Sequence, residues 1–487
     1  MNRKKVIVVG SGIAGIAAAL RLCAKGYHVT VCESNPYLGG KLTEIQLGDF
    51  IFDAGPSLFT MPQNVTELFT LFGEQAEDSF QYVKRNTLCH YFFEDGTFLP
   101  FYGDPNDLKQ SIQTHLGLDP QPVLDYLEHS RFLYDQTHYL FLEHSLHKAA
   151  TYWDKRLPKS LLSLPKMGLM KSMHQDNVKR LKDPKLVQIF DRFATYNGSN
   201  PYQAPAILNM IAHLESGIGS FFPKKGMHSI TQSLVDLAKR NGVEFKTQTR
   251  VKEILVEKGE VRGVKTESGY LPAELVFCNA DIKPAYQYLL PEVKKPKRQL
   301  AQEPSSSAMI FYWGMNRTFE QLDLHNIFFT EDYQKEFDGI FHQGDVYEDP
   351  TVYVHVSSKV VEGHAPEGME NWFVMVNVPA NSGQDWEGLR KSIRERVIAK
   401  LSRCLDVSIA ACIVEEDYLD PVRIEERTSS HQGALYGSSS NNRMAAFLRH
   451  PNFSKVNGLY FVGGSVHPGG GIPLCLWSAK IAVESIS

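Results

Sequence analysis

The sequence predicts an α/β fold, and three features of the chain lead to that prediction. Residues 6–9 are four β-branched residues that run directly into a glycine-rich turn and an apolar helix, residues 16–25. Residues 459–465 again have a buried-strand pattern that leads through glycines into a helix, residues 474–486. Between these ends, short alternating strand patterns are interspersed with helix patterns. Strands that alternate with helices in this way build a parallel sheet covered by helices.

Length and composition exclude several classes of protein. The 487 residues predict two to four domains at about 100–200 residues each. With 43% hydrophobic and 11% aromatic residues, the chain is not disordered, collagenous or a small disulfide scaffold. The 51 Lys+Arg and 55 Asp+Glu leave a net charge of −4, too balanced for bulk electrostatic binding of nucleic acid. Seven scattered cysteines without a C-x-x-C motif predict reduced thiols, a cytoplasmic location and no metal site. The mean hydropathy of −0.26 predicts a soluble chain without transmembrane helices.

The glycines of the first turn decide between two interpretations of the N-terminal segment. Its basic start and apolar run are also typical of a secretory signal or a short membrane span. Gly10, Gly12 and Gly15, however, form a G-x-G-x-x-G pattern directly after the strand. The first glycine makes a tight turn, the second lets the backbone approach a pyrophosphate, and the third lets helix and strand pack closely. We therefore predict a Rossmann-type dinucleotide-binding unit whose helix N-terminus faces the phosphates.

An acidic residue follows at the distance expected of a ribose-binding residue. A second strand pattern, residues 28–32, ends at Glu33, which lies 18 residues after Gly15. A carboxylate at this position accepts hydrogen bonds from ribose hydroxyls, which favours FAD or NAD over NADP.

A second pair of glycines points to a flavin. Gly39 and Gly40 lie just beyond Glu33 and are followed by Lys41 and by Asp53-Ala54-Gly55-Pro56-Ser57. This run resembles the FAD-binding signature of the glutathione-reductase/amine-oxidase superfamily, with Lys41 where arginine is commoner. A lysine offers a point charge instead of a fork, which weakens a bidentate phosphate contact.

The C-terminal motif extends the resemblance. The strand pattern at 459–465 leads into His467-Pro468-Gly469-Gly470-Gly471-Ile472-Pro473 and a helix, whose first N–H groups are suited to stabilise negative charge on a reduced flavin ring. With the N-terminal motifs, this segment resembles the bacterial-type carotenoid desaturases, the phytoene desaturase family, along nearly the whole chain. The resemblance implies FAD as the cofactor. It implies these cofactor-binding residues: Gly10, Gly12, Ile13, Ala14, Gly15, Glu33, Ser34, Gly39, Gly40, Lys41, Leu42, Gly55, Pro56, Ser57, Val251, Ala280, Gly463, Gly464, Ser465, Gly471, Ile472 and Pro473.

The patterns between the two ends divide the chain into three regions. A helix pattern at 228–240 and strand patterns at 243–245, 251–256, 261–265 and 275–281 rejoin the dinucleotide-binding domain. The resemblance implies that the backbone of Val251 forms hydrogen bonds with adenine. The alternative is that Val251 is only a half-buried strand residue. We expect a discontinuous FAD-binding domain of residues 1–80, 222–290 and 455–487, an inserted α+β substrate-binding domain of residues 81–99 and 291–454, and a helical region of residues 100–221. The substrate-binding domain has strand patterns at 308–314, 352–356 and 372–378 and a helix pattern at 387–404.

The helical region carries a basic segment. Between Lys148 and Lys185, ten Lys and Arg and three Asp give a local net charge of +7, which leaves −11 for the rest of the chain. Basic charge interleaved with Trp153, Met167 and Met170 is typical of an interfacial membrane segment. The alternative is a solvated basic face over an ordinary helical core. We expect peripheral contact with the cytoplasmic membrane, because the substrate class that the resemblance implies lives in the bilayer.

The sequence offers few candidates for proton transfer. His467 lies in the turn expected at the flavin, where a neutral imidazole suits general acid–base chemistry. It is equally suited to orienting that turn. Tyr353 and His355 share one face of a strand, where they line the pocket or fill the core. No G-x-S-x-G, P-loop or H-E-x-x-H motif offers another catalytic centre.

Among the carotenoid desaturases, the chain most resembles the 1-hydroxycarotenoid 3,4-desaturases in residues 431–437, 447–451 and 464–467. Such enzymes act near the hydroxylated end of a coloured carotenoid, including monocyclic ones. The implied reaction is hydride transfer to flavin N5 with proton loss, and the terminal acceptor is a quinone or oxygen. A phytoene or diapophytoene desaturase is the alternative. Less favoured are an amine or protoporphyrinogen oxidase, for whose aromatic cage Tyr460 and Trp477 are poor candidates, and a non-enzymatic prenyl-protein-binding protein, which needs no glycine-rich C-terminal turn.

Overall fold

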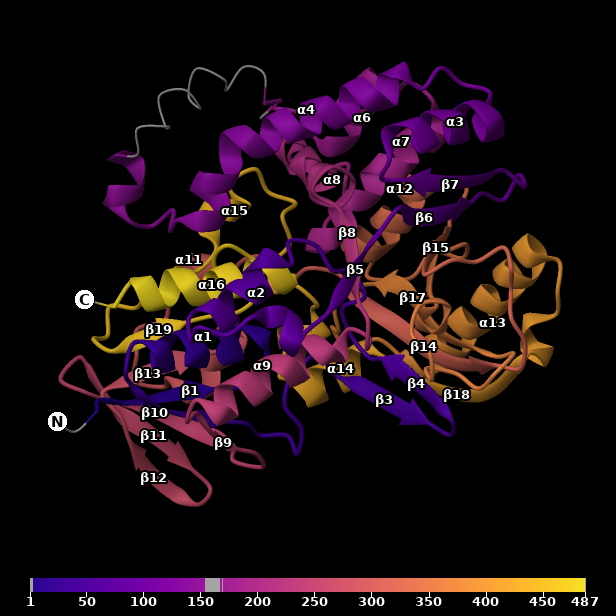
Figure 1. Ribbon diagram of the computed structural model, residues 1–487. Coiled ribbons are helices and arrows are strands. Elements are labelled where there is room, and N and C mark those ends of the chain that lie inside the picture. The colour runs from indigo at the N-terminus through magenta and orange to yellow at the C-terminus, as the bar shows by residue number, and fades with distance from the viewer. Residues whose placement is uncertain (1–2, 154–166, 169, 487) are drawn as a thin grey trace.

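The computed structural model describes residues 3–153, 167–168 and 170–486. These residues form three regions (Figure 1): a dinucleotide-binding region at the lower left, a large mixed sheet at the right and a group of helices along the top.

A five-stranded parallel sheet forms the centre of the dinucleotide-binding region. Its strand order is β19-β13-β1-β2-β9, and each neighbouring pair is parallel. Parallel sheets are normally covered on both faces, so their strands have continuous apolar runs such as residues 6–9. The strands come from distant stretches of the chain: β1 (Lys5–Val9), β2 (His28–Cys32), β9 (Glu244–Lys246), β13 (Leu275–Cys278) and β19 (Leu459–Phe461).

Different layers cover the two faces of this sheet. Helices α1 (Ile13–Ala24), α9 (His228–Arg240) and α16 (Ile472–Glu484) share one hydrophobic core with it. Four alanines of α1, at positions 14 and 17–19, are buried, and their small side chains allow the neighbouring helices to approach closely. The other face packs on an antiparallel sheet of β10 (Val251–Glu257), β11 (Glu260–Thr266) and β12 (Gly269–Pro272).

A seven-stranded mixed sheet of order β18-β14-β17-β16-β15-β6-β7 forms the second region. All nine residues of its interior strand β14 are buried. Helix α13 (Trp386–Leu405) packs on one face, and the hairpin β3 (Glu44–Leu47)–β4 (Phe50–Asp53) packs on the other. Its strands are β6 (Thr87–Phe92), β7 (Phe98–Tyr102), β14 (Ser307–Met315), β15 (His325–Phe328), β16 (Val352–His355), β17 (Glu370–Val378) and β18 (Ile413–Leu419).

The third region is a layer of helices above the cavity between the two sheets. Asp104 and Asp183 cap helices with side-chain oxygens, and Ser172 forms a capping box with Gln175. A short two-stranded sheet, β5 (Tyr82–Arg85) with β8 (Ser220–Pro223), links this layer to the other regions. The helices are α3 (Pro105–Leu116), α4 (Gln121–His138), α6 (Met173–Leu181), α7 (Pro184–Asp191) and α8 (Ile211–His213). Elsewhere lie α2 (Gln63–Thr70), α10 (Ile282–Pro284), α11 (Lys297–Leu300), α12 (Tyr333–Asp338), α14 (Pro421–Thr428) and α15 (Ala445–Leu448).

The predicted element boundaries agree best where a local signal marks them. Strand β2 and helix α9 have the predicted bounds. Helix α1 begins at Ile13, three residues before the predicted start, because Gly12 is its N-cap. Strand β19 ends at Phe461 instead of continuing to residue 465, because the chain turns at Gly463, whose φ is 115°.

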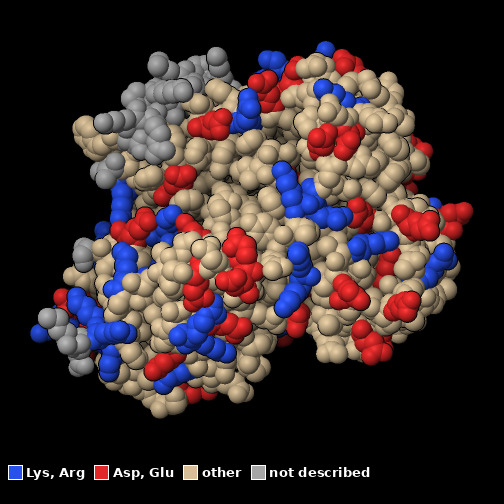
Figure 2. Space-filling model, in the orientation of Figure 1, with Lys and Arg blue, Asp and Glu red and all other residues tan. Residues whose placement is uncertain are grey.

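The basic segment between Lys148 and Lys185 is only partly described, because residues 154–166 and 169 lie outside the described residues. Among its described residues, three cations form ion pairs: Arg180 with Asp176 at 2.8 Å, Lys171 with Asp176 at 3.9 Å and Lys185 with Asp95 at 2.6 Å. On the face shown in Figure 2, charges of both signs are interspersed. In the described parts of the chain, every helix is too short or too polar to cross a bilayer.

Candidate active site

A cavity of about 1280 Å³ lies where the three regions meet. Pockets for a single ligand usually measure about 300–1,000 Å³, so this one has room for a large cofactor beside a second ligand. Both glycine-rich turns lie in its wall, and so do the helical layer and the inner face of the seven-stranded sheet.

Glu33 occupies the position expected of a ribose-binding residue. Its carboxylate accepts hydrogen bonds from Ser11 N at 2.8 Å and from Asn35 N at 2.8 Å, which fixes it at the end of β2. The Glu33 carbonyl accepts from Thr249 N at 2.7 Å, and Val251 follows two residues later in the cavity wall. Glu33 and Val251 therefore border the same end of the cavity.

The N-terminal turn brings bare backbone to the start of α1. Among the described residues, no side chain caps this helix at Gly12, so its first N–H groups are available to an anion. A β-carbon on Gly12 would lie 2.7 Å from Asn279 Nδ2, and one on Gly40 would lie 3.3 Å from Gly12 Cα. On Gly15 a β-carbon would clash with the Gly10 carbonyl oxygen, so this glycine lets the helix pack on the turn.

The cavity wall contains all but one of the residues predicted from the sequence to form the site. Gly15 is the exception, because it packs behind the turn. The predicted residues in the wall are Gly10, Gly12, Ile13, Ala14, Glu33, Ser34, Gly39, Gly40, Lys41, Leu42, Gly55, Pro56, Ser57, Val251, Ala280, Gly463, Gly464, Ser465, His467, Gly471, Ile472 and Pro473.

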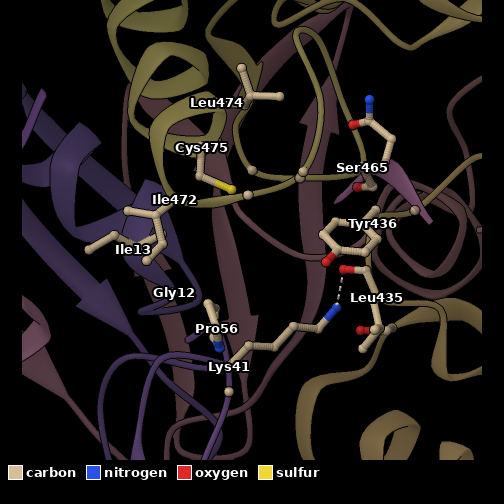
Figure 3. Close-up of a pocket in the computed structure, with 18 of the residues that line it drawn as sticks. Gly12, Ile13, Lys41, Pro56, Leu435, Tyr436, Ser465, Ile472, Leu474 and Cys475 are labelled. Atoms are coloured by element: carbon tan, nitrogen blue, oxygen red, sulfur yellow. Dashed lines mark hydrogen bonds between the residues drawn. The ribbon is translucent and has the colours of Figure 1, made fainter. Parts of the chain in front are cut away.

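Lys41 makes contacts that its motif did not predict. Figure 3 shows its side chain extending along the cavity to the carbonyl oxygen of Leu435. The ammonium donates to that oxygen at 2.9 Å and to the carbonyl of Ala434 at 3.1 Å. Burial lowers the pKa of Lys41, and the nearby Asp281 carboxylate opposes that shift. The lysine thus places a cation near Tyr436 and joins the N-terminal motif to residues 434–435.

Arg449 is a buried cation that sequence reasoning missed. Its guanidinium donates to the carbonyls of Ser438 at 2.9 Å, Tyr436 at 3.3 Å and Gly464 at 3.3 Å. Burial lowers its pKa to about 10. The side chain therefore ties the C-terminal glycine-rich turn to the segment that Lys41 also binds.

The position of His467 favours an orienting role over a catalytic one. Its imidazole is 1% exposed, and Nε2 lies 2.8 Å from the carbonyl oxygen of His144. Because a carbonyl only accepts, Nε2 carries the hydrogen in this contact. Burial lowers the pKa of His467 to about 4, so the ring is neutral at pH 7 and holds the turn against residue 144.

Replacement of His467 by glutamine should change acid stability more than activity. In the unfolded chain the imidazole takes up a proton below about pH 6.5, whereas the folded protein does so only near pH 4. Protonation therefore favours unfolding, and this contribution, complete above pH 6.5, is lost as the pH falls from 6.5 to 4. Between pH 7.5 and 5 the variant should lose about 2 kcal/mol less unfolding free energy than the wild type in urea titrations.

The control is the equivalent change at His342, whose side chain is 52% exposed and which should follow the wild type. A fall of kcat by about 10²–10⁴-fold in the His467 variant, the usual cost of losing a general base, would instead make His467 catalytic. We expect kcat to stay within about tenfold of the wild type, because a glutamine amide reaches the position of Nε2 and can still donate to the carbonyl of residue 144.

The wall also contains His325, Arg192 and Glu215, which were not predicted from the sequence, and Tyr353, which was. The Tyr353 hydroxyl lies 2.8 Å from Ser57 Oγ and 2.8 Å from His325 Nδ1. Arg192 and Glu215 form an ion pair in the same wall. His355 is outside the cavity wall formed by the described residues; it fills the core instead, where burial lowers its pKa to about 3.

Comparison with known proteins settles the family. Residues 13–487 match the model of a protein family described as flavin containing amine oxidoreductases. The chain belongs to that family. FAD is accordingly the cofactor of this oxidoreductase, and the residues present fit it. Glu33 would hold the ribose, the start of α1 the diphosphate, and the turn from Gly463 to Ile472 the ring system.

Two relatives align with this oxidoreductase along nearly its whole length. A 1-hydroxycarotenoid 3,4-desaturase of Flavobacterium sp. (strain P99-3) is 50% identical over 484 residues, with 99% of both chains covered. A 4,4'-diapolycopene oxygenase of Methylomonas sp is 32% identical, with 100% of this chain and 98% of the relative covered. The resemblance to carotenoid desaturases predicted from the sequence is confirmed.

Solved structures share the fold of this oxidoreductase at low identity. An oxidoreductase from Methanosarcina mazei superposes with a TM-score of 0.65 at 16% identity and covers 99% of this chain and 100% of its own. For the amine-oxidase alternative, Tyr460 and Trp477 are the relevant residues. Tyr460 stacks on Phe277 at 4.8 Å, and both Tyr460 and Trp477 are outside the cavity wall that the described residues form.

Proposed function

We propose that this flavoprotein is a carotenoid desaturase that introduces the 3,4 double bond of a 1-hydroxylated carotenoid. The supporting observation is the 50% identity to a 1-hydroxycarotenoid 3,4-desaturase over 99% of both chains. The cavity has the apolar surface that a polyene needs, since its wall includes Leu88, Ile207, Met210, Leu214, Ile327 and Phe373.

The reaction removes two hydrogens from adjacent carbons of the substrate. Bound FAD supplies the acceptor for the hydride, while the second hydrogen leaves as a proton and a quinone or oxygen takes the electrons onward. The chain's own part is to align the polyene and exclude water with its apolar walls. Arg449 and Lys41 add fixed positive charge near the C-terminal turn, which favours negative charge in their surroundings.

The test is conversion of purified carotenoids by the FAD-loaded protein in liposomes. With a 1-hydroxylated carotene we expect a red-shifted absorption spectrum, because one more double bond lengthens the conjugated system. Conversion of colourless phytoene without conversion of hydroxylated carotenes would contradict the proposal and favour the phytoene desaturase alternative. Hydrogen peroxide release with polyamines would favour an amine oxidase.

We further propose that the cavity mouth makes peripheral contact with a membrane surface. Met170, Met444 and Phe447 line the cavity and are 75%, 50% and 40% exposed, so the cavity reaches the surface at this apolar patch. Arg443, whose guanidinium donates to the Met170 carbonyl at 2.7 Å, adds positive charge beside it. Exposed apolar groups next to basic ones favour an anionic lipid surface. Trp153, 87% exposed, precedes the undescribed part of the basic segment.

Replacing Met170, Met444 and Phe447 together by serine should release the protein from membranes. We expect the binding constant for phosphatidylglycerol vesicles to fall at least about 100-fold, because burial of three half-exposed apolar side chains in lipid contributes about 1 kcal/mol or more each. Activity on carotenoid in liposomes should fall in parallel, while activity on detergent-solubilised carotenoid persists. The control replaces Leu71, Tyr270 and Val414, which are 41%, 53% and 50% exposed and lie outside the cavity wall, by serine. Equal vesicle binding by both triple variants would contradict the proposal that this apolar patch binds the membrane.

A further inference from the structure

Two buried charged side chains and one half-buried tyrosine lie together in an apolar part of the cavity wall. Arg192, Tyr196 and Glu215 line the cavity beside Ile211 and Leu214. Arg192 Nη2 lies 3.3 Å from Glu215 Oε1, and the two side chains are only 7% and 3% exposed. The Tyr196 hydroxyl donates to Glu215 Oε2 and accepts from Arg192 Nη1. These three residues are called the polar triad below.

The surroundings of the polar triad have unused hydrogen-bonding capacity. Arg192 Nε and His325 Nε2 are buried and lack a hydrogen-bond partner within the described residues. Both residues line the cavity. A buried donor without a partner is costly and uncommon in folded proteins. The Arg192 Nε–H donor and the His325 ring nitrogen therefore point to a ligand that brings hydrogen-bonding groups into this part of the cavity.

The polar triad lies toward the ring end of the cofactor site. Gly198, two residues after Tyr196, packs so tightly on Tyr436 that a β-carbon would lie 2.8 Å from the Tyr436 ring. Tyr436 follows Leu435, to which Lys41 binds. His325, whose Nε2 has no hydrogen-bond partner within the described residues, connects through the Tyr353 hydroxyl to Ser57 in the flavin-binding segment.

We propose that the polar triad, together with His325, binds a hydroxyl group on the end of the carotenoid substrate. The inference rests on the proposed function and adds the residues that select the substrate. The charges of Arg192 and Glu215 neutralise each other, so the site suits a neutral ligand more than an ion. A hydroxyl donates one hydrogen bond and accepts others, which matches a carboxylate acceptor and an unpaired Arg192 Nε–H donor beside a neutral imidazole nitrogen, which can donate or accept.

The spacing of groups in the substrate agrees with this location. In a 1-hydroxylated carotenoid, only C2 separates the carbon that bears the hydroxyl from the 3,4 bond. A site that holds the hydroxyl during 3,4-desaturation must therefore lie close to the flavin ring, as the polar triad does. A site for the hydroxyl at the far end of a long polyene tunnel would not meet this requirement.

The experiment compares a 1-hydroxylated carotene with the same carotene lacking the hydroxyl, using the FAD-loaded protein in liposomes. The wild type should favour the hydroxylated substrate in kcat/KM by about 100-fold or more, because sites that hydrogen-bond a substrate hydroxyl strongly reject analogues without it. Tyr196→Phe should lower kcat/KM for the hydroxylated substrate about tenfold and leave the other substrate within about twofold. Tyr126→Phe is the matched control, since the Tyr126 hydroxyl binds Asn177 in the buried core outside the cavity wall.

A double variant, Arg192→Met with Glu215→Leu, removes the ion pair as a unit and keeps similar volumes, so we expect it to fold. FAD absorbance and thermal unfolding check this. It should convert both substrates with nearly equal kcat/KM. Equal use of both substrates by the wild type, or an equal loss on both in Tyr196→Phe, would overturn the inference while leaving carotenoid desaturation in place. Conversion of neither carotenoid by the wild type would overturn the proposed function itself.

Discussion

Replacing Gly55 by alanine should yield a protein that no longer retains FAD. A β-carbon at this position would lie 2.9 Å from the carbonyl carbon of Lys41 and closer still to its oxygen. Both partners are backbone, so the clash can be relieved only by separating two segments of the cavity wall. We expect a cost of about 3 kcal/mol, the upper range for overpacking, which corresponds to roughly 100-fold weaker FAD binding if it falls on the bound state.

The measurement is the ratio of flavin to protein absorbance after gel filtration, with urea unfolding of the same samples. Gly103→Ala is the matched control, because a β-carbon there meets Leu88 Cδ2 at an ordinary 3.6 Å. A Gly55→Ala protein that stays yellow and as stable as the control would show that the segments at 41 and 55 move apart easily.

The ion pair between Arg192 and Glu215 should give the largest difference between single and double variants. Arg192→Met alone leaves the Glu215 carboxylate buried and without its cation, which we expect to lower the free energy of unfolding by about 3–5 kcal/mol. Arg192→Met with Glu215→Leu removes both charges and should come within about 1 kcal/mol of the wild type. Urea unfolding followed by intrinsic fluorescence measures both values.

A surface pair provides the control for this cycle. Lys391 and Glu387, whose side chains are 63% and 74% exposed, form an ion pair at 2.9 Å on α13. Removing either partner there should cost less than about 1 kcal/mol. Comparable losses from the buried and the surface single variants would mean that the cavity is well hydrated around Arg192.

The cofactor side of the site could be predicted because its signals are local. Gly10, Gly12 and Gly15 follow a recognisable strand, and the glycine-rich turn before α16 follows another. Each motif joins a strand, a turn and a helix within about two dozen residues, so sequence spacing directly determines spatial arrangement.

The substrate side has no such local signal. Arg192, Glu215 and His325 belong to three separate elements, and only the packing of the helical layer on the seven-stranded sheet brings them into one wall. Arg449 lies in residues 447–451, whose sequence supported the resemblance. Its role, however, depends on the carbonyls of residues 436, 438 and 464. Contacts of this kind follow from tertiary structure and have no pattern in one sequence.

The discontinuous parallel sheet determines the order in which the protein can be built during synthesis. Of the five strands of this sheet, β1 is synthesised before the others, but its neighbour β13 ends at Cys278, and β19 at the sheet edge ends at Phe461. Helix α16, whose first turn borders the cavity, follows later still. The nascent N-terminal half therefore exposes an unpaired strand edge and the apolar α1, both aggregation hazards that chaperones normally shield. The complete wall of the cofactor site can therefore form only after synthesis has passed α16.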